Sequence, residues 1–186
     1  MNKDYHNLYV ITGGPGTGKT TTLNQLKQDG FKCITEDARE IIKEQMATGG
    51  TSLPWKDKKN YTLLMLRKAY ESYSNVLCAD DNDIYFFDRS ILDAVCYADM
   101  ISFPVPQEFN HIIENCIYNK NVFIFPPWPE IYQTDTERKQ NWQEALDTYN
   151  FLKATYQKFG YTLIEVPKDT PRNRAAFIKT HIQIVY

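Results

Sequence analysis

The chain has 186 residues, 42% of them hydrophobic, which is the usual size of one domain and enough apolar material for a sizeable core. Its 21 Lys and Arg nearly balance 23 Asp and Glu, so the formal net charge of -2 does not favour binding to nucleic acid or to a membrane surface. The N-terminal segment is polar, and no apolar run is as long as a membrane span, so we expect a cytoplasmic protein. The four cysteines are widely spaced, so we expect no zinc site.

Short apolar segments alternate with amphipathic segments along the whole chain, which is typical of alternating strands and helices. In chain order, the expected elements are a strand at 8–12, a helix at 19–28, a strand at 31–35, helices at 36–46 and 61–76, a strand at 84–87, a helix at 91–100, a helix at 109–117, a strand at 121–125, a helix at 142–152, a strand at 161–166 and a terminal helix starting at Thr170 and Pro171.

This alternation predicts an α/β fold in which helices cover both faces of a five-stranded parallel sheet, giving three α/β/α layers. We expect one domain spanning residues 1–186, since the chain contains no repeat, linker or low-complexity segment. Ligands of such sheets bind beyond the carboxyl ends of the strands. The residues that directly follow each strand are therefore the candidates for function.

The segment after the first strand reads GGPGTGKT at residues 13–20 and satisfies the pattern GxxxxGK[ST] of a phosphate-binding loop, or Walker A motif. Glycines allow backbone N–H groups to surround phosphate oxygens, and the start of the next helix adds a positive dipole end. We expect Lys19 to bind the β- and γ-phosphates of ATP and Thr20 to bind Mg²⁺. The alternative is an ordinary glycine turn. The expected nucleotide-binding residues are Gly13, Gly14, Pro15, Gly16, Thr17, Gly18, Lys19, Thr20 and Thr21.

Asp88 follows the third strand, in the sequence IYFFDRS. It is a candidate for binding Mg²⁺, as in a Walker B strand, or for accepting the proton of a substrate hydroxyl; the alternative is capping of the next helix, for which Ser90 is also suited. Motor ATPases usually place a water-activating glutamate next to this acid, whereas this chain has Arg89. An NKxD motif for guanine is missing. Small-molecule kinases therefore fit better than motors or GTPases.

A kinase also needs groups that hold its acceptor, and Glu36 directly follows the second strand, with Arg39 one turn later. Glu36 is a candidate for orienting or deprotonating the acceptor hydroxyl, and Arg39 and Arg89 are candidates for binding the acceptor. The alternative for Glu36 and for its neighbour Asp37 is stabilisation of a helix N-terminus.

A kinase further needs a cationic lid over the phosphates, which excludes water from the transferred group. The segment at about 126–142 follows the fourth strand and contains Arg138, which we expect to contact the phosphates during catalysis. The alternative is structural, because Thr134 and Glu137 form the T-x-x-E pattern of a capping box and Arg138 is then a solvated helix residue.

The segments GGPGTGKTT, TEDAREII, FFDRSILDAVCYA and PPWPEIYQTDTERKQNWQEA resemble the AAA_28 family of P-loop ATPases, also described as NadR/Ttd14-like. The order of Glu36 with Arg39, Asp88, and Asp135 with Arg138 is similar to the nicotinamide riboside kinase domain of NadR-type proteins. The resemblance implies a P-loop kinase fold, ATP with Mg²⁺ as cofactors and phosphoryl transfer to a nucleoside-like molecule. The family also contains regulators that bind nucleotides, one of them a GTP-binding protein.

Two functions follow from the sequence. The first is an ATP-dependent kinase, a P-loop phosphotransferase, that moves the γ-phosphoryl group to a small hydroxyl-bearing metabolite such as a nucleoside. The second is a regulatory switch in which bound ATP or GTP controls a surface for a protein partner. The acceptor-side residues Glu36, Asp88 and Arg89 favour the kinase, because a switch has less need of them.

Overall fold

A single parallel sheet organises the chain. The structure, a computed structural model, describes residues 5–79, 81–131 and 141–182, and within these residues five strands pair in the order β2-β3-β1-β4-β5. The five-stranded parallel sheet expected from the sequence is thereby confirmed. The strands are β1 (Leu8–Gly13), β2 (Lys32–Ile34), β3 (Tyr85–Asp88), β4 (Asn121–Phe125) and β5 (Thr162–Glu165).

Helices connect these strands, as the alternating pattern predicts. The α-helices are α1 (Lys19–Gln28), α2 (Asp37–Ala47), α3 (Lys58–Cys78), α4 (Ile91–Met100), α5 (Asn110–Asn115), α6 (Trp142–Lys158) and α7 (Pro171–Thr180). Short 3-10 helices are η1 (Tyr5–Asn7), η2 (Gln107–Phe109) and η3 (Pro129–Ile131). As the sequence predicts, α7 starts with Pro171 in its first turn and is capped by the Thr170 side chain, which accepts a hydrogen bond from the Asn173 N–H at 3.2 Å.

The chain divides into two compact units. The sheet unit comprises residues 1–34, 82–88 and 118–186, and contains all five strands with α1, α6 and α7. The helical unit comprises residues 35–81 and 89–117, and contains α2, α3, α4 and α5. That these units form the single domain expected over residues 1–186 stays a prediction from the sequence.

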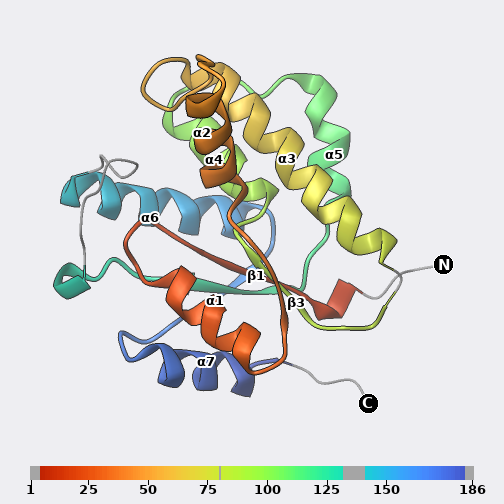
Figure 1. The fold of residues 1–186 in the computed structure, drawn as a ribbon, viewed down its shortest axis with the longest axis vertical. Helices are drawn as coiled ribbons and strands as arrows, with labels where there is room; N and C mark the ends of the chain where they lie inside the picture. Colours follow the sequence, from red (N-terminus) through yellow and green to blue (C-terminus); the bar gives the residue numbers. More distant parts are fainter. Residues whose placement is uncertain (1–4, 80, 132–140, 183–186) are drawn as a thin grey trace. The chain divides into compact units, whose positions relative to one another are not determined.

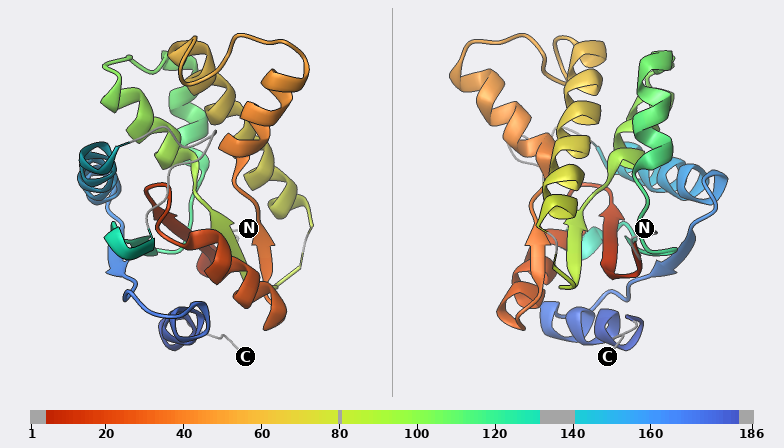
Figure 2. Two further views of the ribbon diagram at one scale, coloured as in Figure 1. Left: turned by 60° about the vertical axis from the view of Figure 1, so that its left-hand side comes forward. Right: turned by 90° about the vertical axis from the view of Figure 1, so that its right-hand side faces the viewer.

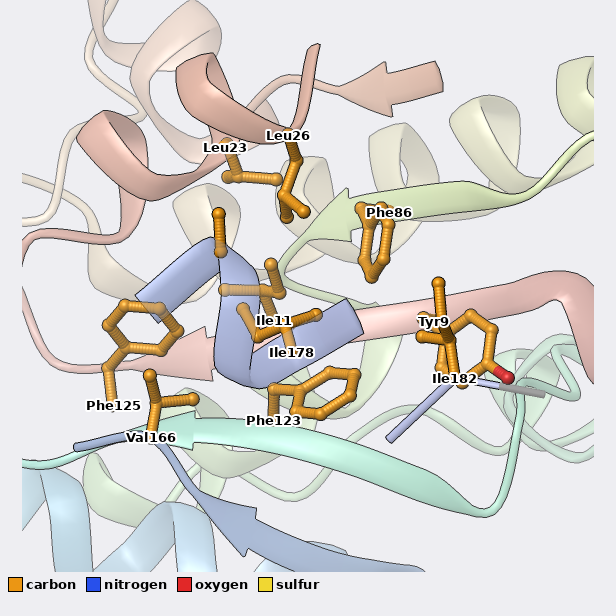
Figure 3. Packing of buried hydrophobic residues seen from close by; sticks show 11 residues of the cluster. Tyr9, Ile11, Leu23, Leu26, Phe86, Phe123, Phe125, Val166, Ile178 and Ile182 are labelled. Carbon is orange, nitrogen blue, oxygen red and sulfur yellow. The ribbon is translucent and has the colours of Figure 1, made fainter. Parts of the chain in front are cut away.

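The sheet unit has three layers, with α1 and α7 together on one face of the sheet and α6 on the other (Figure 1). Side chains that alternate along a strand point to opposite faces, so Tyr9 and Ile11 of β1 share one face. Both are fully buried against Leu26 of α1 and Ile178 of α7 (Figure 3). Aromatic rings from the neighbouring strands complete this core, among them Phe86, whose centroid lies 5.7 Å from that of Tyr9.

In the helical unit, α3 runs beside α2 and α4 (Figure 2). Asp57 caps α3 by accepting a hydrogen bond from the Asn60 N–H at 3.0 Å. A small core forms where Ile41 and Ile42 of α2 pack with Tyr61 of α3. Although α3 is long, neither it nor any other helix among the described residues has the apolar length that crossing a membrane requires.

The helix expected at 109–117 is shorter than the apolar pattern predicts. Its α-helical part, α5, ends at Asn115, and Ile117 is 39% exposed instead of lying on a buried helix face. The Tyr73 hydroxyl binds both backbone groups of Ile117, since it donates to the carbonyl at 3.1 Å and accepts from the N–H at 3.0 Å. Two tertiary hydrogen bonds thus replace the helical bonds that would have extended α5.

Candidate functional site

The phosphate loop connects β1 to α1 in the sheet unit. Gly18 occupies the N-cap position of α1 with φ of 82°, and no side chain caps the helix there. An ordinary helix start receives a Ser, Thr, Asp or Asn cap for its N–H groups, whereas a glycine start leaves these groups for an anionic ligand. The local geometry therefore agrees with a phosphate-binding loop and not with an ordinary glycine turn.

Lys19 is buried within this loop, with 5% of its surface exposed. Its Nζ donates hydrogen bonds to the carbonyl oxygens of Gly13 and Gly14, both at 2.8 Å. The Thr17 hydroxyl also donates to the Gly14 carbonyl, at 3.0 Å. These bonds hold the ammonium group against the loop backbone.

Two oxygen donors of the sheet unit are candidates for Mg²⁺. Thr20 lies in the first turn of α1 and is exposed. Asp88 ends β3 and is 6% exposed, and it lies beside Ile11 of β1, two residues before the phosphate loop begins. Hydroxyl and carboxylate oxygens are ligands that Mg²⁺ accepts, and phosphates commonly supply further ligands.

The N-cap of α4 is Ser90 and not Asp88. The Ser90 hydroxyl accepts a hydrogen bond from the Leu92 N–H at 3.1 Å, and the Asp93 carboxylate accepts from the Ser90 N–H at 3.0 Å. This capping box satisfies the start of α4. Ser90 and Asp93, and not Asp88, therefore cap the helix, which was the alternative to a functional role for Asp88. Burial raises the pKa of the nearby Cys33 thiol to about 11; the charge of Lys27 opposes this shift, and the charge of Asp88 adds a smaller increase.

The helical unit contains a cluster of charged residues that we call the carboxylate–arginine cluster, formed by Glu36, Arg39, Arg89 and Asp93. Glu36 accepts hydrogen bonds on both oxygens, from Arg39 Nε at 3.0 Å and from Arg89 Nε at 2.8 Å. Arg89 also donates from Nη1 to Asp93 Oδ1 at 3.1 Å. The structure thus brings Arg89 together with Glu36 and Arg39, which the sequence analysis predicted from a different segment.

Burial and backbone strain distinguish this cluster from an exposed ion-pair network. The side chains of Glu36 and Arg89 are 13% and 17% exposed, and that of Asp93 is 3% exposed. Arg89 has φ of 78°, a left-handed conformation that is uncommon for residues other than glycine. Such strain occurs where surrounding interactions hold a functional residue in place.

Glu36 and Asp37 do not cap α2 with their side chains. Glu36 occupies the N-cap position but makes no capping hydrogen bond, because its carboxylate binds the two arginines. Asp37 accepts a hydrogen bond from the Ser72 hydroxyl at 2.8 Å, and burial raises the pKa of its carboxyl to about 6. Asp37 thus belongs to the packing of α2 against α3.

The predicted lid falls mainly outside the described residues, and Arg138 with it. The Thr134 and Glu137 pattern also lies outside them. The described part of the lid includes Trp128 and η3 at one end, and at the other end Asn141 and Glu144 form the capping box of α6.

Two residues near the predicted sites were not found from the sequence. Asp93 has a local signal, since it lies four residues after Arg89 and three after Ser90, as helix ion pairs and capping boxes do. Arg174 of α7 has no local signal, because its Nη1 donates to the carbonyl of Thr17, 157 residues earlier, at 3.1 Å.

Comparison with known families and structures agrees with the geometry of the loop and the sheet. The AAA_28 family, described as an AAA domain, matches residues 8–174. No curated protein matches the chain.

Among solved structures, a NadR protein in complex with NR has a TM-score of 0.68 and 18% sequence identity, over 93% of this chain and 50% of that chain. This chain thus spans about half the length of that NadR protein. A deoxyadenosine kinase from M. mycoides has a TM-score of 0.58 and 15% identity, over 92% of this chain and 96% of that one.

A thymidylate kinase from Ehrlichia chaffeensis has a TM-score of 0.61 and 12% identity, over 94% of this chain and 97% of that one. At these identities the likeness shows the fold alone, and these neighbours are small-molecule kinases. The phosphate loop, the strand order and the family match lead to one conclusion: the chain belongs to the AAA_28 family and folds as a P-loop kinase-like domain.

Proposed function

We propose that this protein is an ATP-dependent kinase that transfers the γ-phosphoryl group to a small hydroxyl-bearing metabolite such as a nucleoside. The observation that carries the proposal is the carboxylate–arginine cluster, in which Glu36 lies between two arginines and Arg89 is held in a strained backbone conformation. A protein that only binds or hydrolyses ATP needs no such positioned set of polar groups in addition to its phosphate loop. An acceptor with hydroxyl groups needs them for orientation.

The proposed roles follow from the chemistry of each group. Lys19 neutralises charge on the β- and γ-phosphates as the bond to the leaving ADP breaks. The acceptor oxygen attacks the γ-phosphorus in line with that bond, and Glu36 or Asp88 receives the hydroxyl proton. Arg39 and Arg89 orient the acceptor through the cluster. Arg138, outside the described residues, is proposed to close over the phosphates.

Thr20 and Asp88 are the proposed Mg²⁺ ligands. The fit is chemical, because a threonine hydroxyl at the start of α1 and a buried carboxylate at the end of β3 are hard oxygen donors. The described residues contain no group of three or more His, Cys, Asp or Glu side chains that could hold a metal ion. Mg²⁺ in kinases needs fewer protein ligands than that, since it is bound jointly with the nucleotide. When bound, it neutralises charge on the phosphates.

A product assay tests this function. The full chain is incubated with γ-labelled ATP, Mg²⁺ and a panel of nucleosides and other small hydroxyl-bearing metabolites, and phosphorylated products are separated. We expect a labelled product with at least one acceptor, and its loss in Lys19→Ala and Asp88→Ala. Lys27→Ala on the exposed side of α1 and Asp99→Ala on the exposed side of α4 are matched controls that keep the activity.

Tight ATP binding without any phosphorylated product across the panel, combined with nucleotide-dependent capture of a protein partner, would overturn the proposal. It would instead assign the chain to the class of regulatory nucleotide switches.

A further inference from the structure

Arg174 is a buried arginine whose guanidinium contacts the phosphate loop. It belongs to α7, and 3% of its surface is exposed. Its Nη1 donates to the Thr17 carbonyl at 3.1 Å, and its Nη2 donates to the Thr21 hydroxyl at 3.3 Å. One guanidinium fork thus binds both the end of the loop and the first turn of α1. All of these residues belong to the sheet unit.

Two aromatic rings and a glycine complete the surroundings of this guanidinium. The Arg174 Cζ lies 5.5 Å from the ring centroids of both Phe125 and Trp128. A Cβ atom at Gly18 would lie 2.4 Å from Arg174 Nη1, so the guanidinium occupies the space next to that glycine. Two features therefore favour a glycine at position 18: its φ of 82° and the close approach of the Arg174 guanidinium.

Among the described residues, Arg174 donates no hydrogen bond to a carboxylate. Burial lowers the pKa of its guanidinium, and the charge of Asp169 opposes this only in part. The Arg174 Nε is buried without a hydrogen-bond acceptor in the described part of the chain. The acceptors of Nη1 and Nη2 are a carbonyl and a hydroxyl, both neutral. Arginine keeps its positive charge in proteins. Burying a charge that no carboxylate contacts directly is unfavourable. An anion bound by the neighbouring loop would reduce this cost.

The hydrogen bond to Thr17 has a geometric consequence for the next N–H group. A trans peptide is planar, and its C=O and N–H point in opposite directions. Because Arg174 holds the Thr17 carbonyl, the Gly18 N–H is directed to the opposite side of that peptide. In phosphate loops, backbone N–H groups at this position take part in binding the β- and γ-phosphates.

We propose that Arg174 is a positioning residue for the phosphates of the bound nucleotide. It orients the Thr17–Gly18 peptide for the β-phosphate, and its buried charge is balanced by the phosphates across the loop. The inference rests on the proposed function only in that the loop binds a nucleotide. Phosphoryl transfer and the identity of the acceptor do not enter it.

Nucleotide affinity measured by calorimetry tests this role. ADP and AMP are titrated with Mg²⁺ into the wild-type chain and into Arg174→Met, Arg174→Lys and Lys179→Met. Arg174→Met is expected to raise the Kd of ADP about tenfold or more, since a charged hydrogen-bond donor is lost, and to change the Kd of AMP, which has no β-phosphate, less than about twofold. Arg174→Lys keeps the charge but not the fork, so we expect an increase of about threefold to tenfold.

Lys179→Met is the matched control, because Lys179 is a cation on the same helix that binds Asp29 at the surface. It is expected to leave both affinities unchanged. Circular dichroism of each variant verifies folding, and Arg174→Lys keeps the test informative if Arg174→Met does not fold.

Three results would overturn the role of Arg174. The first is wild-type affinity for ADP in both Arg174 variants. The second is an equal loss of affinity for ADP and AMP. The third is wild-type affinity for ADP in Arg174→Lys alone, because the oriented peptide would then have no role. A kinase assay without product, by contrast, would overturn the proposed function and leave the ADP measurement unaffected.

Discussion

At position 89 an arginine adopts a left-handed backbone conformation, with φ of 78°. For a residue with a side chain this conformation costs about 1 kcal/mol. The ion pairs of Arg89 with Glu36 at 2.8 Å and Asp93 at 3.1 Å offset this cost and fix the direction of the guanidinium. The backbone strain and the two carboxylates thus act on the same side chain.

Arg89→Lys is expected to lower kcat/KM for the phosphoryl acceptor about 100-fold, because one ammonium cannot replace a guanidinium that binds two carboxylates. The Kd of ATP is expected to change less than about twofold, since the loss concerns acceptor binding. Steady-state kinetics at saturating ATP and a nucleotide titration measure the two quantities. Lys68→Met, which removes another ion-paired cation of the helical unit, serves as control. An equal loss of ATP affinity contradicts the acceptor-side role.

Asp37 gives a pH-dependent prediction at the same scale. Burial raises the pKa of its carboxyl from 3.8 to about 6, while the Ser72 hydrogen bond partly opposes this. A raised folded-state pKa means that the folded state binds the proton more tightly than the unfolded state. Asp37 therefore destabilises the fold above about pH 6, and this penalty disappears as the pH falls from about 6 to about 4.

Asp37→Asn is thus expected to stabilise the protein by about 1–3 kcal/mol at pH 8, because the amide oxygen still accepts from Ser72 and carries no charge. The gain should shrink progressively as the pH is lowered from 6 to 4. Urea unfolding across this range measures it. A difference in stability that does not vary with pH would show that the charge of Asp37 is not its cause.

At the scale of elements, the close packing of β1 against β4 sets the entrance to the phosphate loop. Gly13 is the last residue of β1, has φ of 141° and pairs with Phe125 of β4. A Cβ at Gly13 would lie 2.7 Å from the Phe125 carbonyl oxygen, which belongs to the backbone of a central strand and has little freedom to move.

Gly13→Ala is expected to destabilise the fold by about 3 kcal/mol or more, because backbone strain and a steric clash combine. Gly30→Ala is the matched control, since Gly30 also has positive φ, at 96°, but its Cβ would meet no atom within 4 Å. We expect a cost of about 1 kcal/mol for it. Denaturant unfolding of both variants gives the comparison, and equal costs would show that contact with Phe125 is unimportant.

Local patterns were sufficient for most elements and insufficient where distant residues intervene. The glycine-rich loop, the strand at Leu8–Gly13 and the cap at Thr170 follow from short-range rules of backbone geometry and hydrogen bonding. The helix predicted through Ile117 was wrong at its end, because a hydroxyl 44 residues away takes the backbone bonds.

In the candidate site, too, local patterns predicted some residues but not the contacts between distant ones. Positions after strands indicated Glu36, Asp88 and Arg89, since parallel strands bring their carboxyl ends to one edge of a sheet. The pairing of Glu36 with Arg89 spans 53 residues, and that of Arg174 with Thr17 spans 157. No local rule gives such pairings, because they depend on how helices pack after the sheet has formed.

At the scale of the whole molecule, the proposed catalytic and binding residues belong to both units. Lys19 and Asp88 belong to the sheet unit, whereas Glu36, Arg39 and Arg89 belong to the helical unit. The peptide bond between Asp88 and Arg89 is one of the places where the chain passes from one unit to the other. Nucleotide binding and acceptor binding are therefore expected to be separable by mutation.

Thermal denaturation tests this separation. At 100 times its Kd, Mg-ATP is expected to stabilise the wild-type chain by about 2.7 kcal/mol, which raises Tm by about 5–10 °C for a chain of this size. Lys19→Ala should lose most of that shift, whereas Glu36→Gln should retain it. A Glu36→Gln variant that no longer responds to Mg-ATP would contradict the separate roles.

The fate of the γ-phosphoryl group tests the central claim most directly. Phosphorus NMR of ATP, Mg²⁺, the full chain and each candidate acceptor separates the phosphorylated acceptor from inorganic phosphate in one sample. We predict that with the true acceptor most of the group appears on the acceptor, and that Glu36→Gln lowers its formation about 100-fold or more at saturating ATP. The claim would be contradicted if inorganic phosphate were the sole product and formed at the same rate with and without every acceptor.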